Sequence, residues 1–351
     1  MAYSTKFSQP RVGVLGGSIW RQPRWVPADR STDDCNTANG VDALAFAFNG
    51  EYIDYTHVTK ADLSRFDVIF ANANRIPRIF LQKQLQLLEH LPSSVKWISI
   101  IEGNANDYLP PDAEYKQVLD AANLVNVINV HSAPFFRRLT TTPITTVGLP
   151  YPVDGASTYT TPYHQRRREI CLCPILLKRM NELMVARELA MPYYGYSQVM
   201  LRRLNRMVSN WKNFGSILDK NITIKNTHAA YNDPQLTVYH EKSIVDYFRF
   251  NGAAMLWINL DDRYTWGRYV LDAAALRVPI ITTESTVHGK TLFPETTIPH
   301  HFNLDAAVEI GKRLINDNEF YIHCAENAFA QLQQFSFDAV KQKFLDIFSE
   351  L

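Results

Sequence analysis

The feature of the sequence that most constrains the fold is a repeated alternation of short apolar runs with longer segments of helical pattern. The first run, Arg11 to Gly17, ends in two glycines, as is typical of a buried strand that leads into a tight turn. Other strand-like runs occupy 66–71, 95–101, 124–130, 169–177, 222–225, 253–259 and 278–283. Strands that alternate with helices favour parallel sheets covered by helices. The sequence therefore predicts an α/β protein.

Helical patterns separate and follow these strands. They occupy 37–48, 82–90, 113–122, 182–189, 198–214, 241–250, 268–276, 304–316, 319–334 and 339–348. A chain of 351 residues is long for one core and favours two domains of about 150 residues each. The Pro-, Tyr- and Thr-rich stretch near 150–168 is typical of a linker. We expect domains over 1–155 and 169–335, a linker over 156–168 and a closing helix over 336–351.

Composition excludes several classes of protein. The 36 Lys and Arg residues nearly balance the 35 Asp and Glu, so no global charge indicates a polyanionic partner. The four cysteines have neither zinc-site spacing nor the density of a disulfide framework, and we predict no metal site. The N-terminus lacks the apolar core of a signal peptide, and no apolar run is long enough to span a membrane. We expect a soluble, cytoplasmic protein.

The stretch 253–285 carries a recognisable order of residues. A strand ends in a loop, Gly267 precedes a helix, Asp272 follows five positions later, and small residues, Pro279 and a further strand come next. This order resembles the nucleotide-sugar-binding segment of GT-B glycosyltransferases. The resemblance implies two Rossmann-like domains facing across a cleft, with the donor, a UDP-sugar, held by the C-terminal domain. The alternative is an ordinary strand–helix–strand unit with Asp272 as a helix charge.

The roles implied for the donor site have a direct physical basis. A carboxylate such as Asp272 accepts ribose hydroxyls, while the N-terminal N–H groups of a helix favour a diphosphate. Cations at strand-to-helix junctions suit the same diphosphate, and a glycine lets backbone approach it. The candidates are Gly17, Lys178, Arg179, Arg263, Gly267 and Arg268. For each arginine or lysine, a plain surface charge is the alternative, and a lone Gly-Gly pair such as the one ending at Gly17 is more often just a turn.

The sequence also departs from the commonest retaining pattern of this family, in which two glutamates stand eight positions apart. Tyr264 occupies the first of these positions. The layout is similar to that of the inverting phage DNA β-glucosyltransferase, which has an acidic residue straight after an N-domain strand; Glu102 occupies that position here. Inverting transfer needs one general base, and Asp107 is a weaker substitute for Glu102. A solvated or turn-forming carboxylate is the alternative for both, and His131 and His288 are weaker candidate bases. A divalent metal is not required, although it could aid the leaving group.

The acceptor is indicated by a long first loop that combines stacking surfaces with positive charge, namely Trp20, Arg21, Arg24 and Trp25. With the basic runs 166–168 and 202–206, this loop favours DNA carrying a modified base, although tryptophans packed on the domain explain it equally well. The neutral overall charge argues against DNA. A glycan or small-molecule acceptor, and a non-catalytic nucleotide-sugar-binding module, remain alternatives.

Overall fold

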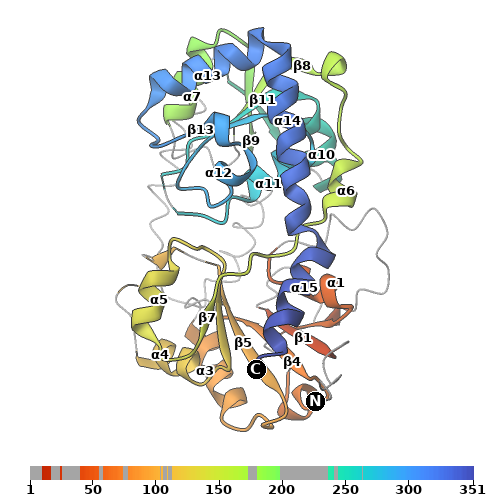
Figure 1. The fold of residues 1–351 in the computed structure, drawn as a ribbon, viewed down its shortest axis with the longest axis vertical. Helices are drawn as coiled ribbons and strands as arrows, with labels where there is room; N and C mark the ends of the chain where they lie inside the picture. The colour runs from red at the N-terminus through yellow and green to blue at the C-terminus, as the bar shows by residue number, and fades with distance from the viewer. Residues whose placement is uncertain are drawn as a thin grey trace. The chain divides into compact units, whose positions relative to one another are not determined.

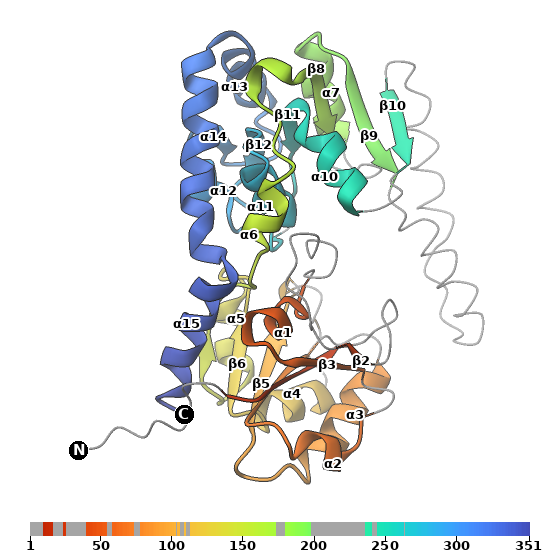
Figure 2. The same cartoon turned by 90° about the vertical axis from the view of Figure 1, so that its right-hand side faces the viewer.

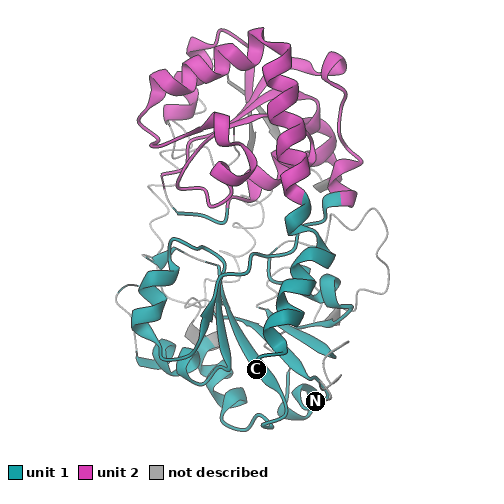
Figure 3. Ribbon diagram, in the orientation of Figure 1, with its two compact units in different colours: residues 1–153, 264–266, 333–351 teal, residues 154–263, 267–332 magenta. Residues whose placement is uncertain are grey.

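The chain forms two compact α/β units (Figure 3). Unit 1 comprises Met1–Val153, Tyr264–Trp266 and Gln333–Leu351, and unit 2 comprises Asp154–Arg263 and Gly267–Leu332. The computed structural model describes residues 10–16, 24–25, 40–54, 58–73, 78–102, 104–105, 109, 113–172, 180–197, 236–240, 244–262 and 264–351.

Unit 1 is built on a sheet in the order β2-β3-β1-β4-β5-β6-β7. Figure 1 labels strands β1, β4, β5 and β7 of this sheet. Its strands are β1 (Val12–Gly16), β2 (Arg24–Trp25), β3 (Glu51–Asp54), β4 (Val68–Asn72), β5 (Lys96–Ile101), β6 (Leu124–Val127) and β7 (Ile144–Thr145). Only β2 runs antiparallel to its neighbour among these strands. The other loops that follow the strands therefore share one edge of the sheet, its carboxyl edge.

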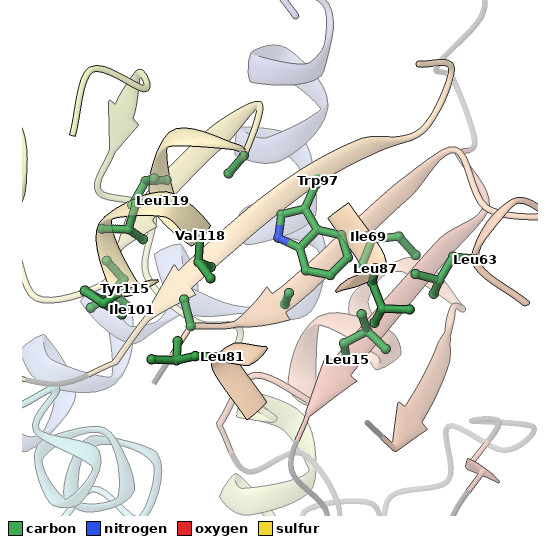
Figure 4. Close-up of a cluster of buried hydrophobic side chains, with 14 of the residues drawn as sticks. Leu15, Leu63, Ile69, Leu81, Leu87, Trp97, Ile101, Tyr115, Val118 and Leu119 are labelled. Atoms are coloured by element: carbon green, nitrogen blue, oxygen red, sulfur yellow. The ribbon is translucent and has the colours of Figure 1, made fainter. Parts of the chain in front are cut away.

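Helices cover both faces of this sheet because side chains alternate along each strand. Ile69 and Trp97 point to the face covered by α2–α5, where Figure 4 shows Trp97 among apolar side chains of the surrounding elements. Phe70 and Ile98 point to the opposite face, against α1 and α15. The helices are α1 (Ala43–Phe48), α2 (Lys60–Leu63), α3 (Arg78–Leu88), α4 (Ala113–Asp120), α5 (Ala133–Leu139) and α15 (Phe337–Phe348).

Aromatic packing attaches the C-terminal helix to the first sheet. The ring of Phe70 on β4 lies 5.0 Å from that of Phe344 and 6.0 Å from that of Phe348, measured between centroids. Phe48 of α1 lies 5.9 Å from Phe348. Because these rings are buried, the last residues of the chain complete the core formed by its first residues.

Unit 2 is built on a parallel sheet in the order β10-β9-β8-β11-β12-β13, with β9 and β10 side by side at one edge (Figure 2). Its strands are β8 (Arg167–Leu172), β9 (Tyr193–Ser197), β10 (Leu236–His240), β11 (Ala254–Asn259), β12 (Ile280–Thr283) and β13 (Thr297–Ile298). Its helices are α6 (Val153–Ser157), α7 (Met180–Glu188), α10 (Ile244–Gly252), α11 (Arg268–Ala275), α12 (Gly289–Leu292), α13 (Leu304–Asn316) and α14 (Asn318–Leu332). Short 3-10 turns occupy Tyr163–Gln165, Pro294–Thr296 and Gln333–Phe335.

Strand β11 shows the same division of faces in unit 2. Leu256 and Ile258 join the apolar cluster beneath α7 and α13. Trp257 points the other way, toward Tyr247 of α10, with ring centroids 6.2 Å apart. The sheet is therefore buried on both sides, which explains the continuous apolar run of β11.

Arg166 ties the amino edge of this sheet together. Its buried guanidinium donates hydrogen bonds to the carbonyls of Gly252, Ala254, Leu276 and Arg277 at 3.0–3.3 Å. These carbonyls lie at the end of α10, in β11 and just after α11. A cation is favourable at helix C-termini, where carbonyls lack intrahelical partners.

The elements agree with the predicted alternation, with some differences. The predicted helix over 198–214 and strand over 222–225 lie outside the described residues. Strands β3, β9, β10 and β13 were not expected, because their runs are short or rich in tyrosine. Arg24–Trp25 pair with β3 as a strand, whereas the sequence predicted a structureless loop there. No helix in the described part of the chain is long and apolar enough to cross a membrane.

Replacing Arg166 should test how much its hydrogen bonds contribute to stability. We expect Arg166→Met to lower the free energy of unfolding by about 3–5 kcal/mol, because hydrogen bonds from a charged donor contribute about 1.5–3 kcal/mol each. Denaturant unfolding would measure the change, with the exposed neighbour Arg168→Met as the matched control. Equal stability of the two variants would contradict the role of Arg166.

Candidate functional site

The carboxyl edge of the second sheet presents the start of helix α11. Gly267, the N-cap of this helix, has φ 76° and ψ 41°, a left-handed conformation that favours glycine. A Cβ at this position would lie 3.4 Å from Cβ of Thr286, in the loop after β12. The glycine thus brings the first N–H groups of α11 close to the loops that follow β11 and β12.

Asp272 lies in the second turn of α11 and is almost fully buried, with 3% of its surface exposed. Its Oδ1 accepts a hydrogen bond from Nε of Arg268 at 2.8 Å, and its Oδ2 accepts one from the hydroxyl of Tyr247 at 3.2 Å. The sequence did not predict this ion pair. It places Arg268 beside the carboxylate four residues later, where the two charges compensate each other.

A group of hydroxyls that the sequence analysis missed surrounds the same edge. Thr283 Oγ1 donates to the carbonyl of Asp261 at 2.6 Å, and Ser285 donates to the same oxygen. The hydroxyls of Thr282 and Thr286 lie 3.0 Å apart. The run of Thr and Ser over 282–286, which spans the end of β12 and the loop after it, was the signal that could have revealed this group. These bonds hold the loops after β11 and β12 against each other.

Glu182 of α7 holds the start of the loop after β11 by a hydrogen bond. It is fully buried in the first turn of α7, and its Oε1 accepts the backbone N–H of Leu260 at 2.8 Å. The sequence offered no signal for this contact, because a lone Glu in a helix is usually solvated. The loop that leads toward Gly267 is therefore fixed at its beginning.

Glu102 follows β5 at the carboxyl edge of the first sheet. The side chain is partly buried, and its Oε1 accepts the backbone N–H of Val41 at 3.0 Å, just before α1. Burial raises the pKa of the Glu102 carboxyl above its ordinary value, and the hydrogen bond from Val41 offsets part of that rise. Glu102 is thus both a link to the start of α1 and a carboxylate that is easier to protonate than a solvated one.

The neighbouring strand β6 ends in a turn that presents His131. Asn129 Oδ1 accepts the N–H of His131 at 3.0 Å, and Ser132 Oγ accepts the N–H of Ala105 at 3.1 Å. His131 is exposed, and its ring centroid lies 4.7 Å from that of Tyr264. Its exposed place at the sheet edge contrasts with His288, which is buried just before α12.

Several predicted site residues lie outside the described part of the chain. These are Gly17, Trp20, Arg21, Asp107, Lys178, Arg179 and Arg263. Arg24 and Trp25 are described only as backbone in β2. The roles assigned to all of these residues stay predictions. No three His, Cys, Asp or Glu side chains in the described ranges group as metal ligands, and a metal as an aid to the leaving group also stays a prediction.

The basic run 166–168 needs a correction. Arg166 is buried against backbone carbonyls, so neither a phosphate contact nor a solvated surface describes it. Arg167 packs 3.7 Å from the ring centroid of Phe250 and pairs with Glu169 at 3.0 Å. Sequence could not separate these arginines from surface ones, because their partners other than Glu169 lie about 80 or more positions away.

Comparison with known proteins gives a fold and no family. No protein-family model and no curated protein matches the sequence. Sucrose-phosphate synthase from Thermosynechococcus elongatus matches the structure at a TM-score of 0.62 and 12% identity, over 97% of this chain and 98% of that one. The α,α-trehalose 6-phosphate synthase of Burkholderia multivorans matches at 0.62 and 9%, over 97% and 96%. Anabaena HepE, solved in complex with UDP-glucose, matches at 0.61 and 10%, over 97% and 100%.

These similarities show that the chain has the GT-B fold, as the sequence predicted. None of the three proteins is named as acting on DNA, and the similarity in layout to a DNA glucosyltransferase stays a prediction.

The pKa of Glu102 generates a prediction about stability. The pKa of Glu102 is higher in the folded protein than in the unfolded chain. Between these two pKa values the folded protein keeps a proton that the unfolded chain loses. The free energy of unfolding therefore falls as pH rises from the ordinary Glu pKa to the raised one. Glu102→Gln keeps an acceptor for the Val41 N–H and removes this titration. We expect the free energy of unfolding of Glu102→Gln, relative to wild type, to increase over that pH range and then level off. A difference that is constant with pH would contradict the raised pKa.

Proposed function

We propose that this protein is a glycosyltransferase that moves a sugar from a UDP-sugar donor to an acceptor. The observation that carries the proposal is the similarity of fold over 97% of the chain to sucrose-phosphate synthase and trehalose 6-phosphate synthase. HepE, with the same fold, holds UDP-glucose, which supports the choice of donor. The alternative of a non-catalytic binding module is kept as an outcome of the tests below.

Unit 2 would bind the donor at the start of α11. The diphosphate is negative and is favoured by the N–H groups that follow Gly267. A carboxylate accepts hydrogen bonds through several lone pairs, so Asp272 can accept ribose hydroxyls in addition to the groups of Arg268 and Tyr247. Arg268 would then hold the carboxylate in place through its hydrogen bond to Oδ1. Lys178, Arg179, Arg263 and Gly17 are proposed as further contacts to the phosphates.

Unit 1 would supply the general base. In the proposed inverting step, Glu102 takes the proton of the acceptor hydroxyl, and the acceptor oxygen forms a bond to the anomeric carbon. The bond from that carbon to the diphosphate oxygen breaks at the same time, and UDP leaves with the electron pair. A base works best when its pKa approaches the working pH, and the raised pKa of Glu102 favours this role. Asp107 is the proposed substitute.

For the acceptor, a glycan or a small sugar has more support than DNA. Part of the argument for DNA was the basic run 166–168, and Arg166 and Arg167 are engaged in contacts within unit 2. The loop with Trp20, Arg21, Arg24 and Trp25 still fits a stacked base or a sugar ring. A duplex carrying a modified base is therefore retained as an outcome of the experiments.

Donor binding is tested by Asp272→Asn. The loss of hydrogen bonds to a charged acceptor, about 1.5–3 kcal/mol, should weaken UDP binding roughly ten- to more than a hundredfold in calorimetry. The thermal midpoint should also fall, because Arg268 loses its buried ionic partner. Affinity is therefore measured well below the midpoint, with the exposed helix-start residue Asp305→Asn as control. Unchanged affinity in a folded variant would remove Asp272 from the donor site.

Catalysis is tested by Glu102→Gln, with the exposed Glu89→Gln of the same unit as control. If Glu102 is the base, turnover should fall about 10²–10⁴-fold while UDP binding is kept. Wild-type activity should fall on acidification at a pH above the ordinary Glu range, and the product should have the inverted anomeric configuration. Full activity of Glu102→Gln would leave Glu102 only its structural link to Val41. Donor binding without any transfer or donor hydrolysis would favour the binding module.

A further inference from the structure

Three exposed side chains form an aromatic platform at the carboxyl edge of the first sheet, defined here as Val130, His131 and Tyr264. Val130 and Tyr264 each expose 48% of their surface. The rings of His131 and Tyr264 have centroids 4.7 Å apart and planes inclined by 38°. All three residues belong to unit 1. The platform is an apolar and aromatic surface that faces solvent.

The residues around the platform hold it rigidly. The turn before His131 is held by the Asn129 side chain, and the Ser132 hydroxyl accepts the N–H of Ala105. Trp266, two residues after Tyr264, packs so closely on Gly148 that a Cβ there would lie 2.5 Å from Cη2 of the indole. It also meets Phe335 edge-on, with centroids 6.2 Å apart. Exposed rings on a fixed backbone lose little entropy when a ligand covers them.

The platform also lies beside the proposed base. Strands β5 and β6 pair in parallel, with Ile101 opposite Val127, and the N–H of Ile128 donates to the carbonyl of Ile101 at 3.1 Å. Glu102 directly follows Ile101, while Val130 and His131 follow Ile128 at the same edge. Loops at the carboxyl ends of neighbouring parallel strands are where α/β folds bind ligands.

We propose that the aromatic platform binds a pyranose ring of the acceptor by stacking. The C–H face of such a ring is apolar and slightly positive, and it packs against the negative face of an aromatic ring. The sugar hydroxyls then project from the edge of the platform toward the strand that bears Glu102. This inference rests on the proposed glycosyltransferase function and adds the chemical class of the acceptor.

The side chains of the platform itself favour a neutral ring over a nucleic acid. None of the platform residues is Lys or Arg, whereas affinity for nucleic acids comes mainly from cations on phosphates. Arg137 and Arg138 of α5 lie in its last turn, at the opposite end from His131. An exposed apolar surface that is held in place suits an uncharged stacking ligand.

The test uses the full chain without donor and two sugar probes, maltotriose and glucose 6-phosphate. Saturation-transfer NMR should show contact of the sugar ring protons with wild type. Tyr264→Ala should weaken binding about three- to tenfold, as expected for loss of one aromatic contact, while Tyr264→Phe stays within about twofold. Phe302→Ala is the matched control, because Phe302 is an even more exposed aromatic of unit 2, at 69%. It should leave sugar binding unchanged.

Three results would overturn the proposal. The first is that wild type shows no contact with either sugar. The second is that Tyr264→Ala binds the sugars as tightly as wild type does. The third is that the protein binds a duplex oligonucleotide but no sugar, and that this duplex binding is lost in Tyr264→Ala. UDP calorimetry on the same variants reports separately on the proposed function, and Tyr264→Ala should leave UDP affinity unchanged. If wild type binds sugar but not UDP, the proposal that the platform binds sugar stands and the glycosyltransferase proposal is overturned.

Discussion

Parallel strand pairing is the constraint on which the rest of this structure depends. In both sheets, parallel pairs carry the loops that follow successive strands to one edge. This places Glu102 beside the turn of His131 in unit 1, and Gly267 beside the Thr and Ser hydroxyls after β12 in unit 2. Parallel sheets also need helices on both faces, so the same pairing accounts for the burial of the apolar strands.

Buried charges in unit 2 are compensated by the backbone of distant segments or by a neighbouring side chain. Arg166 donates to four backbone carbonyls, and Glu182 accepts an N–H 78 residues away. Asp272 instead has its charged partner one helical turn earlier, in Arg268. An unpaired charge in these positions would be too costly to keep ionised. Unit 2 therefore combines local pairs, which a helix supplies by itself, with long-range bonds that exist only after the sheet has formed.

The predictability of the candidate site differs from residue to residue. Gly267 and Asp272 could be found because their spacing reflects one strand–loop–helix unit, and the position of Glu102 could be found because it ends an apolar strand. The link from Glu102 to Val41 and the contact of His131 with Tyr264 could not be found. Both join residues separated by 61 or more positions, and no local pattern records such a contact. The same reason explains why the sequence analysis counted Arg166 in a basic run that favours DNA.

The sequence by itself determined the α/β class, the GT-B order of elements and most strand and helix positions, because these follow from local periodicity and turn residues. Only the tertiary structure decided which residues at the carboxyl edges of the sheets contact each other. It placed Tyr264–Trp266 and the C-terminal helix in unit 1, although each follows chain that belongs to unit 2. It also set the burial of Asp272 and the exposure of Tyr264. Burial and neighbours depend on how distant segments pack, and packing is a property of the whole fold rather than of any one segment.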